Sequence, residues 1–405
     1  MLSGQGKHLS FHTPGHKRRG ADITELSYSD NLFSPHGVIK AAEEEIAERL
    51  GAYRTFFLTD GSTAGVHAML YALREKGVKR VALSPYSHPS VAGGCKILNM
   101  EPVFIPVALK AGIPAQPQRE ETEKALKDAD ALLLTSPDYY GFFPDLSYFR
   151  ELTRRERKPL VIDGAHGSHL HFEARYAGNF ADMWVDGAHK SLPALTQGAA
   201  VSAKTGEWAD ALEEGVRLFH TSSPSYPILA SVEDAFLLPR NPKIERAAEK
   251  FKERIGAVAN DDWTKILVPY GANAETVERY LEENGVYPEF NDGNYLMFYL
   301  SPCTKTAELN TLFALLQDCP APEAVKAEES VHDTDESPSF GEIEYLPLQD
   351  AVSKICAADA GIFPPSLPLV RRGERIGADV IRRLERAAHT FGLKEGKIAV
   401  YTEQK

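Results

Sequence analysis

Short apolar runs alternate with helical patterns along the first half of the chain. Residues 38–50 show a helical pattern, because the apolar residues Ile39, Ala42, Ile46 and Leu50 recur at helical spacing with acidic residues between them. The apolar runs between such segments have the length of strands. Strands that alternate with helices predict a mostly parallel sheet covered on both faces. We expect strands at residues 55–58, 79–83, 102–106, 131–135, 160–162, 183–185 and 197–203.

The pattern changes after about residue 260. Residues 263–315 show an α+β rhythm that favours a separate, smaller domain. Residues 321–339 are acidic and rich in Ala, Glu, Ser and Pro, which is typical of a linker or an exposed loop. The first 37 residues have no clear period. We therefore expect an arm at residues 1–37, a large α/β domain at residues 38–260 and a smaller α+β domain at residues 261–405.

The composition is that of a folded protein with more than one domain. The chain has 405 residues, of which 43% are apolar and 25% charged, so it can bury a sizeable core. Its 45 basic and 57 acidic residues give a net charge of -12. This balance argues against nucleic acid or an anionic membrane as a partner.

The cysteines and the apolar stretches bear on the cellular compartment in which we expect the protein. Four cysteines lie far apart without a C-x-x-C pair, so neither a disulfide framework nor a zinc knuckle is expected. Residues 1–9 lack the apolar centre of a signal sequence, and no later stretch reaches the roughly 20 apolar residues of a membrane span. We expect a soluble, cytoplasmic protein.

Two of the expected strands end beside groups that can do chemistry. Strand 160–162 runs into Asp163, and strand 183–185 is followed closely by Lys190. Parallel strands open their carboxyl ends into one crevice. With the turn at Gly61, these groups are what pyridoxal phosphate needs: an amine for a Schiff base, an anion for the pyridine nitrogen and backbone donors for the phosphate. A helix N-cap for the Asp and a surface charge for the Lys remain the structural alternatives.

The glycine turn has the form of a phosphate site. Gly61, Ser62 and Thr63 lie between strand 55–58 and a helix that closes at Gly77. The first N–H groups of a helix have no internal partner and lie at the positive end of its dipole, so they suit an anion. Because Ser and Thr are also good N-caps, a purely structural interpretation stays open.

Histidines follow two of the strand ends. His88 lies in the loop after strand 79–83, where a lone histidine is more often solvated than functional. His166, His169 and His171 form an H-x-x-H-x-H pattern that can ligate a metal, but no Cys or spaced carboxylate accompanies it. We expect no metal, a structural role for His169 and His171, and a place near a cofactor ring for His166.

Several motifs are spread along the chain. They are H-T-P-G-H-K from His12, G-S-T from Gly61, S-H from Ser87, D-x-A-H-G-x-H from Asp163, A-H-K-x-L-x-A-L-T-Q from Ala188, T-S-S-P-S-Y from Thr221 and P-P-x-x-P-L-x-x-x-G-E from Pro364. With them the chain resembles the bacterial ornithine/lysine/arginine decarboxylases along most of its length. The resemblance implies a fold type I large domain with a mostly parallel seven-stranded sheet, a smaller α+β C-terminal domain, and pyridoxal 5'-phosphate as the cofactor.

The resemblance also implies roles for single residues. Lys190 is expected to form the Schiff base, Asp163 to pair with the pyridine nitrogen and His88 to stack on the cofactor face; these three are the expected catalytic residues. Ala165 and His166 are expected to line the ring. The other expected cofactor-binding residues are Gly61, Ser62, Thr63 and His189 around the phosphate, with Thr221 and Ser222 reaching this active site or that of a neighbouring subunit.

Such enzymes build their sites at a subunit interface, so the resemblance implies a homodimer or a larger homo-oligomer, with the arm at residues 8–37 as part of it. Two positions depart from the family pattern. Gly164 stands where many members have Glu, and Gly187 stands where many have a phosphate-binding Ser. A lost hydroxyl weakens a phosphate contact by about 1 kcal/mol, which backbone donors can offset.

The leading hypothesis is decarboxylation of a basic amino acid (arginine, lysine or ornithine) to the amine and carbon dioxide, in polyamine biosynthesis. Because a fold does not determine a reaction, aminotransferase or aldolase chemistry on the same cofactor is the alternative. A third hypothesis is a degenerate homologue without turnover, which the two glycine departures motivate. Release of carbon dioxide rather than a keto acid would separate the first two.

Overall fold

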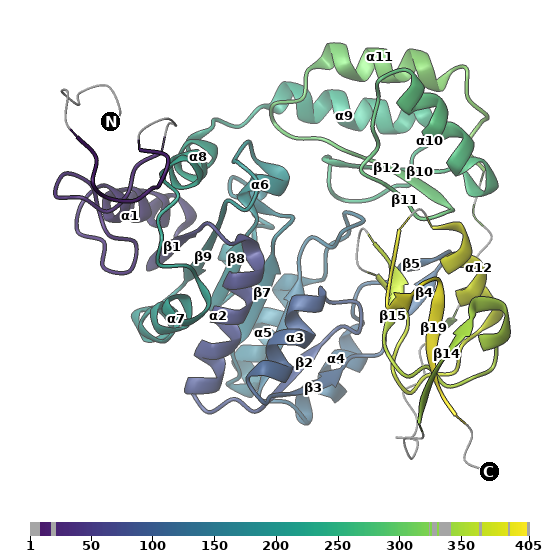
Figure 1. Ribbon diagram of the computed structural model, residues 1–405, viewed down its shortest axis with the longest axis horizontal. Helices are drawn as coiled ribbons and strands as arrows, with labels where there is room; N and C mark the ends of the chain where they lie inside the picture. The colour runs from purple at the N-terminus through teal and green to yellow at the C-terminus, as the bar shows by residue number, and fades with distance from the viewer. Residues whose placement is uncertain are drawn as a thin grey trace.

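The largest feature of the computed structural model is a seven-stranded sheet of order β1-β9-β8-β7-β6-β2-β3 (Figure 1). The structure describes residues 9–17, 22–323, 325, 330–331, 342–363, 367–387 and 389–402. β9 runs antiparallel to both of its neighbours, and the other pairings are parallel, which confirms the predicted α/β sheet. The strands are β1 (Arg54–Leu58), β2 (Arg80–Leu83), β3 (Glu101–Phe104), β6 (Ala131–Thr135), β7 (Leu160–Gly164), β8 (Met183–Asp186) and β9 (Ala199–Ala203).

Helices cover both faces of this sheet. One face carries α1 (Val38–Leu50), α4 (Arg119–Lys127), α5 (Leu146–Glu156) and α8 (Tyr226–Leu237); the other carries α2 (Gly61–Glu75), α3 (Pro89–Ile97) and α7 (Gly206–Phe219). Successive residues of a strand point to opposite faces, so neighbours enter different cores. Ile162 packs with the first set and Val161 with the second, and both are fully buried.

A smaller antiparallel sheet of order β10-β12-β11 follows in the chain. Its strands are β10 (Lys265–Pro269), β11 (Phe290–Asn291) and β12 (Tyr295–Tyr299), and α9 (Pro242–Ile255), α10 (Ala274–Glu283) and α11 (Thr306–Leu316) pack with it in a separate hydrophobic cluster. α9 belongs to this cluster although it precedes residue 260. We therefore propose a domain boundary before α9 instead of at residue 260.

The C-terminal residues build a further hydrophobic cluster next to the smaller sheet (Figure 1). Its elements are β14 (Ile343–Pro347), η4 (Leu348–Ala351), β15 (Ala360–Ile362), β16 (Leu367–Val370), α12 (Ala378–Arg386), β17 (Thr390–Phe391), β18 (Leu393–Lys394) and β19 (Lys397–Tyr401). β4 (Ala108–Lys110), β5 (Ile113–Pro114) and β13 (Ser330–Val331) form another small sheet. Most of the predicted linker at residues 321–339, and Pro364 with its neighbours, lie outside the described residues.

The described part of the expected arm contains neither helix nor strand, and its end is anchored at Asp30. The Asp30 carboxylate accepts hydrogen bonds from the backbone N–H groups of His36, Gly37 and Ile39. The Tyr226 hydroxyl, on α8, accepts from the backbone N–H of Asp30 at 2.7 Å and donates to its carbonyl at 2.9 Å. The arm therefore enters α1 in a defined geometry.

None of the helices within the described ranges is both long and apolar enough to cross a membrane.

Candidate active site

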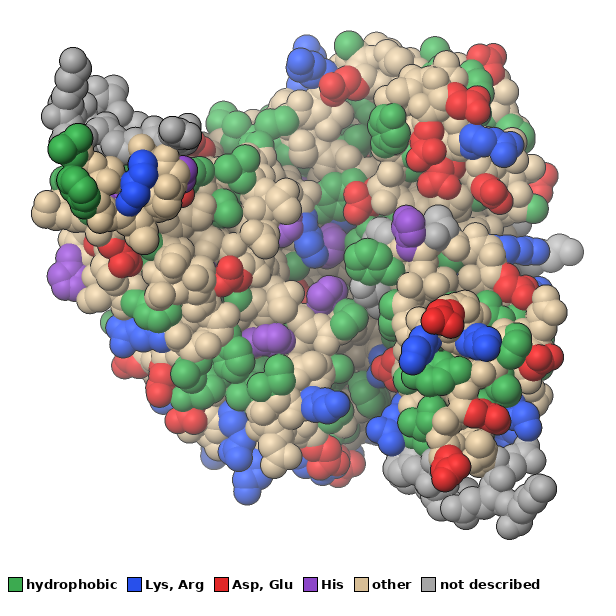
Figure 2. Space-filling model, in the orientation of Figure 1, with side chains coloured by type: hydrophobic (Ala, Val, Ile, Leu, Met, Phe, Trp, Pro, Cys, Tyr) green, Lys and Arg blue, Asp and Glu red, His purple; other side chains and the backbone are tan. Residues whose placement is uncertain are grey.

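A cavity of about 300 Å³ lies where β6 and β7 end and α2 begins. Figure 2 shows the molecule hollowed in this region, between the large sheet and the C-terminal parts, with histidine side chains inside the hollow. The cavity gathers most of the residues that the sequence singled out. These are Gly61, Ser62, Thr63, His88, Asp163, Ala165, His166, His189 and Lys190.

The expected amine and the expected carboxylate come from neighbouring strands. β7 pairs with β8 in parallel, and Asp163 lies opposite Val185. The short helix α6 (Ala188–Ser191) begins directly after β8 and carries Lys190. Asp163 is buried, and its Oδ1 accepts a hydrogen bond from the backbone N–H of Ala165 at 3.2 Å. The strand pairing therefore brings both groups to one wall of the cavity.

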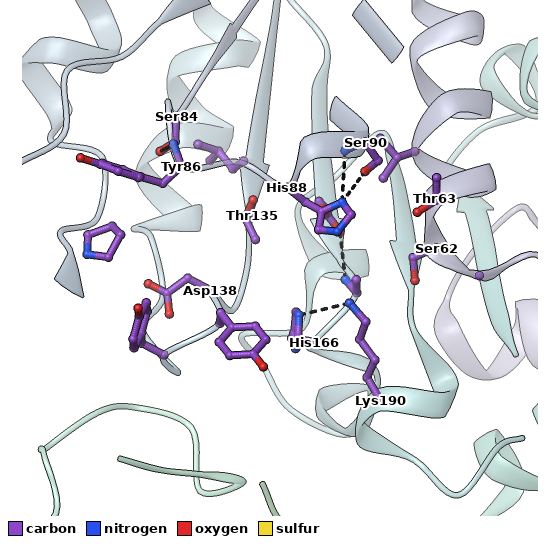
Figure 3. Close-up of a pocket in the computed structure, with 18 of the residues that line it drawn as sticks. Ser62, Thr63, Ser84, Tyr86, His88, Ser90, Thr135, Asp138, His166 and Lys190 are labelled. Carbon is purple, nitrogen blue, oxygen red and sulfur yellow. Dashed lines mark hydrogen bonds between the residues drawn. The ribbon is translucent and has the colours of Figure 1, made fainter. Parts of the chain in front are cut away.

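Lys190 is held against His166. Its Nζ lies 3.2 Å from the His166 Nε2 (Figure 3). Burial lowers the pKa of Lys190 from its ordinary value, the charge of Asp163 opposes this shift, and the charge of Lys265 adds to it. A lower pKa raises the fraction of neutral amine, which is the nucleophilic form of lysine.

The His166 ring is neutral. Burial lowers its pKa well below the ordinary value, and the cations of Lys190 and Lys265 lower it further. The ring centroid lies 5.0 Å from that of Tyr139 in an edge-on arrangement. His166 therefore sits at the Lys190 nitrogen as an uncharged ring whose orientation is restricted by its neighbours.

His88 caps the N-terminus of α3. Its Nδ1 accepts a hydrogen bond from the backbone N–H of Ser90 at 3.2 Å and lies 2.8 Å from the Ser90 Oγ. Burial lowers the pKa of His88, while Asp163 raises it and Lys190 lowers it. Figure 3 shows the ring between Ser90 and the Lys190–His166 pair. The sequence predicted this histidine at the site, and the N-cap explains how it is oriented.

The start of α2 has the donors that a phosphate requires. Gly61 has a φ of +74°, which brings the chain from β1 into the helix, and its N–H donates to the Gln197 carbonyl at 2.9 Å. Among the residues that the structure describes, the buried Ser62 Oγ has no hydrogen-bond partner. A buried hydroxyl without a partner at a helix N-terminus suits an anionic ligand. The residues present therefore fit the phosphate of pyridoxal phosphate.

Gly187 leaves no room for a side chain. A Cβ at this position would lie 2.3 Å from the Ala165 carbonyl oxygen and 3.0 Å from the Ser62 Oγ. The departure from the family pattern is thus matched by a close approach of two backbone segments. A side chain at position 187 therefore cannot contribute a phosphate contact without a shift of the backbone.

Of the three remaining predicted cofactor residues, His189 lines the cavity, whereas Thr221 and Ser222 do not. The His189 Nδ1 donates to the Gly198 carbonyl at 2.9 Å, which orients the ring at the cavity wall. Thr221 and Ser222 are not among the lining residues; the Thr221 N–H donates to Asp60 at 2.7 Å, and Ser222 is exposed. A contact of these two residues with another subunit's site remains a proposal.

The cavity also contains residues that the sequence left without a role. Thr135 is opposite Asp163 across the β6–β7 pairing, and its buried Oγ1 has no partner among the described residues. Its position at the end of an apolar strand was the available signal. Asp138 accepts from the Gln116 side chain at 2.6 Å, and burial raises the pKa of Asp138 to about 7. Nothing in the local pattern indicated Gln116.

The three histidines of the H-x-x-H-x-H pattern have three different environments. His166 contacts Lys190, the His169 Nε2 lies 3.0 Å from the Asp262 carboxylate, and the His171 Nδ1 lies 2.8 Å from the Ser168 carbonyl. Within the described ranges, no three His, Cys, Asp or Glu side chains are grouped as metal ligands. The absence of a metal stays a prediction.

Comparison with known proteins identifies the family. Residues 15–255 match the family model described as Orn/Lys/Arg decarboxylase, major domain. This match spans more than half of the chain, so the chain belongs to the Orn/Lys/Arg decarboxylase family, as the motifs predicted.

Individual relatives cover nearly the whole chain. The uncharacterized protein YaaO of Bacillus subtilis is 28% identical in an alignment 462 positions long, which covers 98% of this chain and 96% of that protein. The arginine decarboxylase of Bacillus anthracis is 28% identical in an alignment 437 positions long, which covers 92% of this chain and 88% of that protein. The crystal structure of the lysine decarboxylase LdcF of Francisella novicida has the same fold, with a TM-score of 0.71 at 16% identity over 91% of this chain and 72% of that one.

Proposed function

We propose that the protein is a pyridoxal phosphate-dependent decarboxylase that converts a basic amino acid (arginine, lysine or ornithine) to the corresponding amine and carbon dioxide. The observation that carries the proposal is the half-buried Lys190 amine, which follows the strand next to that of Asp163. Family membership and the arginine decarboxylase among the relatives support it.

The donor set suggests how the cofactor would be held. Lys190 would hold it covalently through Nζ, Asp163 would face the pyridine nitrogen, and the Ser62 hydroxyl with the N–H groups that follow Gly61 in α2 would bind the phosphate. Pyridoxal phosphate supplies the electron sink for the bond that breaks at the alpha carbon of the substrate. Asp163 is a carboxylate on a buried strand, so it favours a positive charge on the atom that it faces.

The cavity wall favours loss of the substrate carboxylate. Val66, Pro114 and Leu134 give part of the lining an apolar character. A carboxylate is poorly solvated there, whereas neutral carbon dioxide is not penalised. A proton replaces the carboxylate at the same carbon, and Lys190 and His88 both carry exchangeable protons on this wall.

The finer assignments belong to the same proposal. A role in polyamine biosynthesis follows from the amine product, and a cytoplasmic location fits the need of the cofactor for a metabolic supply. We also propose a homodimer or larger assembly, because Leu9 and Phe11 of the arm are large apolar side chains exposed on the described chain.

The test is an assay of the purified protein, supplied with pyridoxal phosphate, on arginine, lysine and ornithine. We expect carbon dioxide release from one of the three, and loss of both release and cofactor absorbance in Lys190→Ala. Borohydride reduction followed by mass spectrometry should place the cofactor on Lys190. Keto-acid formation would favour aminotransferase chemistry, and full activity of Lys190→Ala would refute the assignment.

A further inference from the structure

A lysine with a fully buried side chain, Lys265, lies next to the active-site loop that carries His166. Lys265 is the first residue of β10, and its side chain is 0% exposed. Its Nζ lies 2.9 Å from the Asp262 Oδ2, 2.9 Å from the Tyr299 hydroxyl, 3.1 Å from the Thr264 Oγ1 and 3.2 Å from the backbone carbonyl of His166, so that four acceptors share its three N–H donors. A buried ammonium costs several kcal/mol of desolvation before its partners compensate, and an apolar residue often serves stability better. The position therefore calls for a role other than packing.

The partners of Lys265 reach the loop that carries His166 at two points. Lys265 bonds to the carbonyl of His166 itself. Asp262, also 0% exposed, accepts from the N–H and hydroxyl of Thr264 and faces the Nε2 of His169, three residues beyond His166. Burial acts to raise the pKa of Asp262, but Lys265 and then His169 hold it well below its ordinary value. The Lys265–Asp262 pair thus holds the loop of residues 166–169 at two points, and we call this pair and its two contacts the clamp.

Tyr299 extends the network to the His166 ring. It lies on β12, its hydroxyl accepts a hydrogen bond from Lys265, and its ring centroid is 4.2 Å from the Lys265 Nζ. The same hydroxyl lies 3.5 Å from the His166 Nδ1. Since its oxygen already accepts from the ammonium, its own proton is available to Nδ1. A neutral ring that accepts at Nδ1 carries its proton on Nε2.

In that tautomer the donors run in one direction toward the candidate nucleophile. Lys265 donates to Tyr299, the Tyr299 hydroxyl lies 3.5 Å from the His166 Nδ1, and the His166 Nε2 lies 3.2 Å from the Lys190 Nζ, so the direction of the last two contacts depends on the tautomer of His166. We propose that Lys265 is a positioning residue that holds His166 in the neutral tautomer protonated on Nε2, so that His166 acts as a hydrogen-bond donor to the Lys190 nitrogen. The smaller sheet would in this way control the protonation of a nitrogen on the large domain.

A consequence for the cofactor follows, and it rests on the proposed function. The hydrogen bond donated by His166 and the nearby charge of Lys265 both favour the unprotonated form of the Lys190 nitrogen. Removing them should therefore raise the pH at which the lysine-linked cofactor loses its proton. The groups that bear on this nitrogen in the described structure include Asp163, His88, His166, His189, Lys265 and Glu289.

Two variants test the hydrogen-bond network from Lys265 to His166 separately from the stability of the fold. Lys265→Met removes the cation and leaves Asp262 without it, so this variant tests the whole clamp. Tyr299→Phe removes one hydroxyl and leaves the Lys265–Asp262 pair intact. Lys252→Met is the matched control, because Lys252 is a second nearly buried lysine that bonds to the Asn260 side chain at 2.8 Å and the Asp262 carbonyl at 2.7 Å.

The first measurement is the His166 tautomer, read from nitrogen chemical shifts of protein with isotope-labelled histidine and assigned with His166→Gln. We expect an Nε2-protonated ring in the wild type and in Lys252→Met, and a loss of that preference in Tyr299→Phe and Lys265→Met. This readout needs no turnover. An Nδ1-protonated ring in the wild type, or an unchanged tautomer in folded Tyr299→Phe, would overturn the proposal.

The second measurement is a pH titration of the visible absorbance of the protein loaded with pyridoxal phosphate. We expect the midpoint to rise by about one pH unit in Lys265→Met, and by less in Tyr299→Phe. Lys252→Met should keep the wild-type midpoint. A wild type without such absorbance would count against the proposed function, while the tautomer measurement would still decide the role of Lys265.

Discussion

The Lys190 Nζ and the His166 Nε2 lie 3.2 Å apart although 24 residues separate them in the chain. The contact exists because β7 and β8 are adjacent and parallel, so that the segments following both strands meet at one edge of the sheet. It places an imidazole ring that favours its neutral form against a half-buried amine whose pKa is lowered. The relationship gives the candidate active site its centre and leads to predictions about the groups around it.

Asp163→Asn tests the carboxylate on the ring nitrogen. The amide keeps the size of the side chain but removes its charge, and a hydrogen bond to a charged group is worth roughly 1.5–3 kcal/mol, or about 10- to 100-fold. We expect weaker cofactor retention and a turnover number lower by about that factor, measured by equilibrium dialysis and carbon dioxide release. An unchanged turnover would remove Asp163 from the ring nitrogen.

Gly187→Ser tests whether the missing hydroxyl of the family pattern can be restored. Because a Cβ would meet the Ala165 carbonyl at 2.3 Å, we expect a loss of stability of about 1–3 kcal/mol and poorer cofactor retention, not a gained phosphate contact. Urea unfolding and cofactor titration measure both. Gly93→Ala, in α3 with nothing within 4 Å of the added Cβ, is the control and should be neutral or slightly stabilising. Tighter cofactor binding by Gly187→Ser would contradict the steric argument.

Glu43→Gln tests the cost of a buried acid on α1. Burial raises the pKa of Glu43 from 4.5 to about 8, and its carboxyl accepts from the backbone N–H of Phe57 at 2.9 Å. Because the folded pKa lies above the unfolded one, the associated stability is complete below pH 4.5 and is lost as the pH rises through about 8. Gln keeps an oxygen that can accept from the Phe57 N–H but has no carboxyl proton to lose. The variant should therefore be more stable than the wild type at pH 8 by on the order of 3 kcal/mol.

The Glu43 comparison needs two pH values and a control. The difference between variant and wild type in urea unfolding should be small at pH 4.5 and grow toward pH 8. Glu44→Gln, at an exposed position with only a 3.8 Å ion pair to Lys40, should differ little from the wild type at both. A Glu43→Gln effect that does not depend on pH would show that Glu43 is not protonated in the folded state.

Asp182→Ala separates stability from the site. Arg150 binds the Asp182 carboxylate through two hydrogen bonds of 2.8 and 2.9 Å, and the Leu160 N–H donates to it at 2.8 Å, at the end of β7 away from the cavity. Losing this cluster should lower the free energy of unfolding by about 2–4 kcal/mol. The turnover number and the cofactor absorbance of the folded variant should stay at the wild-type level. A large fall in turnover would show coupling along β7.

Local patterns in the sequence predicted the α/β sheet and indicated the residues expected at the site. Apolar runs and helical spacing are short-range signals, so the strands that lead to Asp163 and Lys190 were predictable, and consecutive parallel strands brought the two residues together. The motifs added the family, which the match to residues 15–255 confirms. The Gly61 turn was indicated by its place between a strand and a helix, whereas the expected role of His88 came from the resemblance, because a lone histidine after a strand is more often solvated.

The tertiary structure alone decided which distant groups surround that site. Lys265 contacts the carbonyl of a residue 99 positions away, and Tyr299 approaches the His166 ring across 133 positions. No spacing rule links such pairs, because they meet only when the smaller sheet packs on the large domain. The lack of space at Gly187 likewise depends on the backbone of Ala165 passing close by. Periodicity along the chain determines its elements, whereas packing between them determines which buried charges face one another.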